Sequence, residues 1–230
     1  MRARAWYIPH PNTITALRIA ATPAIILTLF VLGPVDGAVP AFCLFALAAL
    51  SDGLDGYIAR RHNLVTAMGR MLDPIADKLL VGAATLMLIA QDTISGPHVL
   101  AAVIIVAREI VVSGLRELLA TLDALEKVKV TRLAKWKTGA QMVAIACLMI
   151  APAISGDGGI GALVGIGEGW AGGDVVMQTG LALLWLAAIV TCYTGANYFM
   201  AGLDDIRAAD GHRSGTPSCD PQPDLGQREG

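Results

Sequence analysis

The sequence predicts an all-α protein that crosses a membrane six times. Of its 230 residues, 55% are hydrophobic and only 16% are charged, and the mean hydropathy is +0.60, a balance that soluble globular proteins do not have. Apolar runs long enough to cross ~30 Å of hydrocarbon recur along the chain. Lysine and arginine are confined to short patches between these runs. Together these three observations indicate a polytopic membrane protein.

The six expected spans follow one another with short connections. The first comes after a basic segment without a small-residue cleavage site, so we expect a retained helix rather than a signal peptide. The last follows a glycine-rich segment, 156–174, which contains no basic residue and is typical of an external loop. In chain order the spans are 14–33, 37–60, 73–91, 98–119, 138–155 and 176–201.

Polar segments flank the six-helix domain, which we place at 14–203. In the juxtamembrane segment 1–13, Trp6 and Tyr7 precede a Pro-x-Pro, a pattern that fits interface anchors and a short helix on the membrane surface. Residues 204–230 are polar and are expected to form a tail without fixed structure.

The placement of basic residues predicts which side each connection faces. All 17 lysines and arginines fall within 2–18, 60–78, 108–137 and 207–228. In a six-span chain these patches are the N-terminus, two connections and the C-terminus, all on one side of the membrane. By the positive-inside rule that side, with both termini, is the cytoplasm.

The composition argues against two other classes of protein. A net charge of −2 and an aromatic content of 5% provide neither a basic surface nor a stacking platform for nucleic acid. The four cysteines form no CxxC pair or Cys/His cluster. We therefore expect no nucleic-acid partner, no structural disulfide and no zinc site.

Four aspartates lie close together in a chain that is otherwise poor in charge. Asp52 and Asp55 are three residues apart at the end of the second span, and Asp73 and Asp77 are four apart on the third. Each pair shares one helix face. Two antiparallel helices joined by a short connection would therefore point these carboxylates toward each other near the membrane surface. Four carboxylates that close cannot all remain ionised unless cations hold them.

The aspartates therefore predict a metal site. Carboxylate oxygens suit hard divalent cations, and four of them suit two Mg²⁺ or Mn²⁺ ions. Two ions about 4 Å apart can clamp a pyrophosphate and stabilise an in-line displacement at phosphorus.

Three other interpretations stay open at this point. Asp73 followed by Pro74 would make a good helix start, and Asp52 and Asp55 could be surface residues at a helix end. A divalent-cation transporter also uses membrane carboxylates, although it is expected to place them near the bilayer midplane or on several helices. A membrane scaffold without catalysis would leave the spacing of the four aspartates without a reason.

The four aspartates belong to a longer pattern with fixed gaps. It reads Asp52-x-x-Asp55-Gly56-x-x-Ala59-Arg60, then eight residues, then Gly69-x-x-x-Asp73-x-x-x-Asp77. This pattern resembles the signature of the CDP-alcohol phosphatidyltransferases, and no fixed position departs from it. Members of that family are six-helix membrane enzymes, commonly homodimers, that move a phosphatidyl group from CDP-diacylglycerol to an alcohol and release CMP.

The resemblance implies a role for each matching residue. It makes all four aspartates metal ligands, and Asp77 also the general base for the acceptor hydroxyl. An alcohol is a poor nucleophile at neutral pH, so a nearby carboxylate base is also chemically reasonable. Asn12 and Thr15, which open the first span, are weaker candidates for nucleotide contacts because they could equally be helix caps. The resemblance places four residues along the CDP pocket: Gly56, Ala59, Arg60 and Gly69.

Three basic residues outside the pattern bear on the choice of acceptor. Arg108 sits within an apolar run, where an unpaired charge is unfavourable, so a partner such as Glu109 or a bound phosphate is expected. Arg116 lies about two helical turns later on roughly the same face, and Lys135 precedes the fifth span. Cations beside the aspartates would bind an acceptor that is itself anionic, such as a phosphate ester.

These stretches, with "PNTITALRIAATP" and "MLDPIADKLL", are most similar to the bacterial branch of the family that uses sn-glycerol 3-phosphate. The resemblance therefore assigns Arg108, Arg116 and Lys135 to the acceptor phosphate. It also implies the bacterial inner membrane, with membrane lipids around the helices and an active site that faces the cytoplasm. Inositol phosphate, serine and phosphatidylglycerol stay open as other acceptors, and inositol phosphate is the hardest to exclude.

Overall fold

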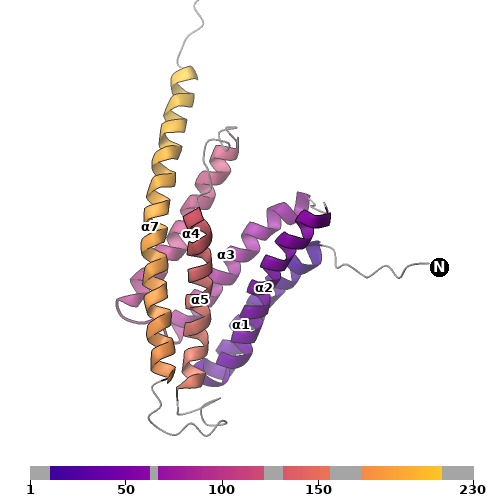
Figure 1. Cartoon of the computed structure of the whole chain (residues 1–230), viewed down its shortest axis with the longest axis vertical. Coiled ribbons are helices and arrows are strands. Elements are labelled where there is room, and N and C mark those ends of the chain that lie inside the picture. The colour runs from indigo at the N-terminus through magenta and orange to yellow at the C-terminus, as the bar shows by residue number, and fades with distance from the viewer. Residues whose placement is uncertain (1–10, 63–66, 122–131, 156–171, 214–230) are drawn as a thin grey trace, which may run out of the picture.

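The computed structural model describes residues 11–62, 67–121, 132–155 and 172–213, and within them every regular element is an α-helix. The short membrane-surface helix expected within residues 1–13 falls mainly on residues outside these ranges. One end of the molecule holds the N-terminal ends of α3 and α5 and the C-terminal ends of α2, α4 and α7 (Figure 1). The helices are α1 (Pro11–Asp36), α2 (Ala38–His62), α3 (Ala67–Ala90), α4 (His98–Thr121), α5 (Arg132–Ile154) and α7 (Gly172–Arg213).

Glycine and proline shape the first helix and its reversal into the second. Helix α1 begins at Pro11, whose fixed φ and missing N–H suit the first helical position. At Gly33 the backbone adopts a φ of 81°, which favours glycine. The N–H of Gly37 then donates to the carbonyl oxygen of Gly33 at 3.1 Å, and a Cβ on Gly37 would lie 2.5 Å from that oxygen. The chain can therefore reverse within a few residues only because both positions are glycine.

The connection between α3 and α4 is fastened to α1. The side-chain amide of Gln91 donates to the backbone oxygen of Leu29 at 2.7 Å. The N–H of Ile94 donates to the carbonyl of Leu88 at 3.1 Å, and the Ile94 side chain belongs to the buried core. These contacts fix the connection against α1 although the two segments are far apart in the sequence.

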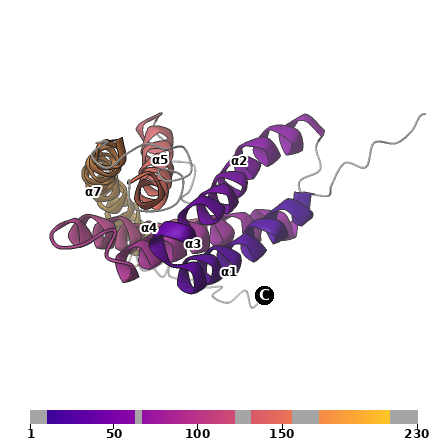
Figure 2. The ribbon, with the colours of Figure 1, turned by 90° about the horizontal axis from the view of Figure 1, so that it is seen from below.

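The helices pack as two groups that share one core. Helix α1 packs against α2 and α3, whereas α7 packs against α4 and α5, and α5 also contacts α2. Figure 2 shows α5 beside α7 and the α1–α3 group on the other side of α5. Every helix contributes to the core, for example through Ile25, Phe45, Leu80, Ile105, Leu148 and Leu184.

The outer surface of this bundle is apolar. Phe30 is 79% exposed, Leu47 67% and Ile110 66%, a degree of apolar exposure that suits lipid rather than water. Within the described residues, four segments have the length and composition to cross a membrane, and a shorter apolar segment, Ala38–Ser51, lies in α2. The four are Thr15–Asp36, His98–Leu115, Lys137–Ile154 and Gly172–Ala196. The protein is thus a multi-pass membrane protein built from helices.

Two helix boundaries differ from the expected spans. Helix α3 begins at Ala67, so Asp73 and Pro74 lie inside it and the interpretation of Asp73 as a helix start is wrong. Helix α7 continues to Arg213, through residues 204–213 of the segment expected to lack fixed structure. Alanine, isoleucine and arginine in residues 204–213 are compatible with a helix, which continues past the apolar part of α7.

Candidate functional site

Two of the four aspartates have described side chains, and both lie on α3. Asp73 is exposed, and the side chain of Asp77 is 39% exposed. Because they are four residues apart in a continuous helix, they stack on one face, as the spacing predicts. Two carboxylates are therefore available to solvent, one turn apart.

Helix α1 supplies a partner for each of these carboxylates. The hydroxyl of Thr15 donates to Oδ1 of Asp73 at 2.5 Å, and Nη1 of Arg18 donates to Oδ1 of Asp77 at 2.8 Å. Thr15 and Arg18 are three residues apart on α1 and thus share a face. Thr15 is 2% exposed and Arg18 1%. The α3 carboxylates are therefore held from the protein side by two buried groups.

The sequence reasoning missed the role of Arg18. It placed this arginine in the N-terminal basic patch, where positive-inside anchoring explains most charges. The signal was its position inside the apolar stretch "TALRIAATP", where a charged side chain normally requires a partner. Thr15 is likewise not a helix cap, because α1 begins at Pro11.

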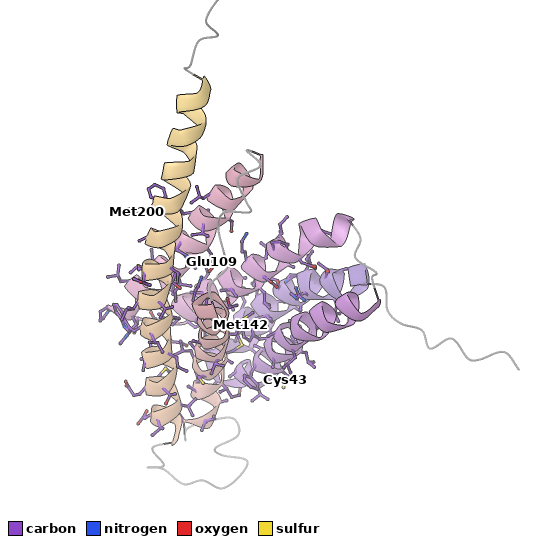
Figure 3. All side chains as sticks on the ribbon, turned by 45° about the horizontal axis from the view of Figure 1, so that its top comes forward. Cys43, Glu109, Met142 and Met200 are labelled. Atoms are coloured by element: carbon purple, nitrogen blue, oxygen red, sulfur yellow. The ribbon has the colours of Figure 1, made fainter. Side chains whose placement is uncertain are left out.

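A second polar cluster joins α4, α5 and α7. Oε1 of Glu109 accepts hydrogen bonds from Nη1 of Arg108 at 3.1 Å and from Nζ of Lys137 at 2.5 Å. Nη2 of Arg108 also donates to Oγ1 of Thr194 at 3.2 Å. Figure 3 marks Glu109 on α4, which packs against α7. The expectation that Arg108 has a partner such as Glu109 is confirmed.

The packing of α7 allows this second cluster to form. A Cβ on Gly195 would lie 3.1 Å from Cγ of Arg108, so glycine lets α7 approach the arginine closely. Lys137 is 4% exposed, which distinguishes it from a lysine that anchors the protein to lipid headgroups. The sequence reasoning identified Arg108 but did not foresee the roles of Lys137 or Thr194.

The side chains of the other candidate residues lie outside the described part of the structure. The arrangement of the two aspartate pairs face to face therefore stays a prediction. Among the residues with described side chains, which do not include Asp52 and Asp55, no group of three or more His, Cys, Asp or Glu could hold a metal ion. The residues in question are Asn12, Asp52, Asp55, Gly56, Ala59, Arg60, Gly69, Arg116 and Lys135.

The described half of the candidate site fits a divalent cation in its chemistry. Asp73 and Asp77 offer carboxylate oxygens, the ligands that Mg²⁺ and Mn²⁺ prefer. Both lie at a solvent-facing position on α3, where a water-soluble reactant has access. The contacts from α1 fix the position of each carboxylate, which a metal site requires of its ligands.

The whole chain was compared with known proteins. The family model for CDP-alcohol phosphatidyltransferase matches residues 8–193, a range that includes every candidate site residue. The protein belongs to the CDP-alcohol phosphatidyltransferase family, and the family expected from the aspartate pattern is confirmed. Membership favours an enzyme over the divalent-cation transporter.

Three relatives show how far the similarity extends. A CDP-diacylglycerol–glycerol-3-phosphate 3-phosphatidyltransferase of Rickettsia bellii is 42% identical over 193 residues, which cover 83% of this chain and 93% of the relative. The protein of the same name from Escherichia coli is 35% identical over 197 residues, which cover 85% of this chain and 96% of the relative. A cardiolipin synthase (CMP-forming) of Oryza sativa is 38% identical over 188 residues, covering 77% of this chain and 52% of the relative.

Proposed function

We propose that this protein transfers the phosphatidyl group of CDP-diacylglycerol to sn-glycerol 3-phosphate, giving phosphatidylglycerol phosphate and CMP. The main support is the similarity to relatives with this activity in their names, which are 35–42% identical and align over 83–85% of this chain. The position of Asp73 and Asp77 on a solvent-facing helix surface supports the same conclusion, because the acceptor is water-soluble and the donor is a lipid.

Asp77 acts as the general base in the proposed reaction. It takes the proton from the acceptor hydroxyl while that oxygen attacks the phosphorus of the phosphatidyl group. The bond between this phosphorus and the oxygen of CMP breaks, and CMP leaves with the electron pair. The pairing of Asp77 with Arg18 at 2.8 Å supports this role, since it holds the carboxylate in a fixed position from which it can reach the acceptor hydroxyl.

The proposed site holds two Mg²⁺ or Mn²⁺ ions. Their ligands are Asp73 and Asp77 on α3 together with Asp52 and Asp55 on α2. Ions bound there supply positive charge that stabilises the transferring phosphate and the leaving CMP. On α2 and α3, Gly56, Ala59, Arg60 and Gly69 line the CDP pocket, and Asn12 of α1 contacts the nucleotide. Thr15, the other nucleotide candidate, is 2% exposed and donates its hydroxyl to Asp73, so it acts through that aspartate instead.

The acceptor phosphate is proposed to bind Arg108, Arg116 and Lys135, on α4 and α5. Arg108 supports this assignment, because it is a partly buried cation whose side chain is already held in place by Glu109 and Thr194. A dianionic phosphate monoester binds such a cation more strongly than a neutral alcohol does.

The similarity to the rice cardiolipin synthase supports a second candidate acceptor, phosphatidylglycerol. Incubation of the purified protein with CDP-diacylglycerol, Mg²⁺ and one acceptor at a time tests the choice. We expect CMP release with glycerol 3-phosphate and none with phosphatidylglycerol, serine or inositol phosphate. CMP release with one of the other acceptors but not with glycerol 3-phosphate would contradict the proposal.

The distribution of basic residues and the bacterial relatives support a location in the bacterial inner membrane. Six membrane-spanning helices then place both termini and the active site on the cytoplasmic side. The family resemblance implies a homodimer, and the mass of the purified protein in detergent tests it. Cysteine labelling at either terminus of intact cells tests the sidedness.

A further inference from the structure

Arg18 and Thr15 differ from residues that contact a substrate. They are 1% and 2% exposed, whereas the carboxylates to which they donate are partly or largely open to solvent. The donors therefore approach from inside the protein, and the exposed side of each carboxylate faces away from them. A ligand at the open side would meet the aspartates first.

The two contacts repeat along the helix pair. Thr15 meets Asp73, and Arg18, one turn further along α1, meets Asp77, one turn further along α3. Helices α1 and α3 also pack directly against each other. A small shift of α1 relative to α3 would therefore move both carboxylates together.

We infer that α1 positions the α3 carboxylates, with Arg18 as a positioning residue for Asp77 and Thr15 for Asp73. An aspartate side chain can rotate about two torsions, and a donor at one oxygen restricts both. The exposed part of each carboxylate is then held in place on the open side, where a cation and the acceptor hydroxyl are proposed to bind. The binding of a cation and an acceptor at the open side rests on the proposed function. The contacts of Thr15 and Arg18 with the two aspartates do not.

The burial of Arg18 argues against two simpler explanations. An arginine that anchors the protein to lipid headgroups extends to the interface, whereas Arg18 is fully buried. An ion pair kept only for stability is also a weak explanation, because buried pairs are often no better than apolar residues of the same volume. A role in holding Asp77 explains why the arginine is buried and why its partner is not.

Two variants with little change in volume test the inference. Thr15→Val removes only the hydroxyl donor, and Arg18→Lys keeps the charge but loses the planar guanidinium. Thr28→Val is the matched control, because the Thr28 hydroxyl donates to the backbone of its own helix, at Ala24. Mn²⁺ binding to the purified proteins without substrates is measured by electron paramagnetic resonance, and kcat and KM are measured in parallel.

We expect Thr15→Val and Arg18→Lys to weaken Mn²⁺ binding and to lower kcat, each about tenfold to a hundredfold, the range for residues that orient metal ligands. The KM for CDP-diacylglycerol and for glycerol 3-phosphate should change less than about threefold, and Thr28→Val should resemble the wild type. Arg18→Met should show the largest loss, and if it does not fold, the two milder variants still decide the matter.

Wild-type Mn²⁺ affinity in both Thr15→Val and Arg18→Lys would overturn the inference, as would a lower melting temperature with unchanged affinity and kcat. The proposed function fails in a different way. If the wild type released no CMP with glycerol 3-phosphate, the Mn²⁺ titration would still report whether α1 positions the carboxylates.

Discussion

Nζ of Lys137 on α5 lies 2.5 Å from Oε1 of Glu109 on α4, and the same oxygen accepts a hydrogen bond from Arg108. One carboxylate oxygen thus contacts two cations inside a membrane protein. The lysine side chain is 3% exposed and that of Glu109 28%, so the lysine end of this ion pair is well shielded from water. Loss of this ion pair should therefore lower the stability of the whole helix bundle.

Glu109→Gln is expected to destabilise the protein by about 3 kcal/mol, the lower end of the range for breaking a buried ion pair, because Glu109 is partly exposed. The amide no longer carries the negative charge that Nζ of Lys137 and Nη1 of Arg108 contact. Unfolding in mixed micelles, followed by circular dichroism, measures the change. Asp174→Asn, at an exposed carboxylate in the first turn of α7, is the control, with a loss below about 1 kcal/mol. Equal stability of the two variants would contradict the pairing.

The close packing of α5 against α7 gives a second prediction. A Cβ on Gly180 would lie 2.8 Å from Cγ of Leu148, so Gly180→Ala should cost about 1–3 kcal/mol through overpacking. Gly139→Ala on α5 is the matched control, because a Cβ there would meet nothing within 4 Å and alanine is the better helix former. Thermal unfolding should show that the Gly180→Ala protein is less stable than the Gly139→Ala protein. A Gly180→Ala protein as stable as Gly139→Ala would show that the helices are not packed this closely.

Arg108→Gln tests the site proposed for the acceptor phosphate. A hydrogen bond to a charged group contributes about 1.5–3 kcal/mol, so the KM for glycerol 3-phosphate should rise about tenfold to a hundredfold. The KM for CDP-diacylglycerol should stay the same. Ser113→Ala removes a hydroxyl that bonds only to the backbone of the same helix and serves as the control. Equal rises in both KM values would indicate a general disturbance of the protein instead.

Much of this architecture could be predicted from the sequence, because hydrocarbon thickness and charge placement act over long stretches. Each of the six expected spans coincides with a helix, and in the part of the chain that the structure describes four of them have the length and composition of a membrane span. The helix ends were harder to place. Helix propensity continues α7 past its apolar part to Arg213, and α3 begins at Ala67 rather than at the aspartate before Pro74.

The candidate site was predictable where chemistry fixes the spacing along one helix, as it does for Asp73 and Asp77. The support from Thr15 and Arg18 was not, because it depends on how α1 lies against α3, fifty-eight or more residues away in the chain. Lys137 shows the same limit. As a basic residue at the start of a span it resembles an anchor, and only the packing of α4, α5 and α7 shows that it is buried against Glu109.

The central claim is that Asp77 is the base in a phosphatidyl transfer to glycerol 3-phosphate. The most direct measurement is CMP release from CDP-diacylglycerol by wild type and Asp77→Asn, with binding of CDP-diacylglycerol measured on the same preparations. We predict that the wild type releases CMP only when glycerol 3-phosphate is added. The variant should lose activity by at least about 10²–10⁴-fold, the usual contribution of a general base, while it largely retains CDP-diacylglycerol binding. Wild-type CMP release by Asp77→Asn would contradict the account.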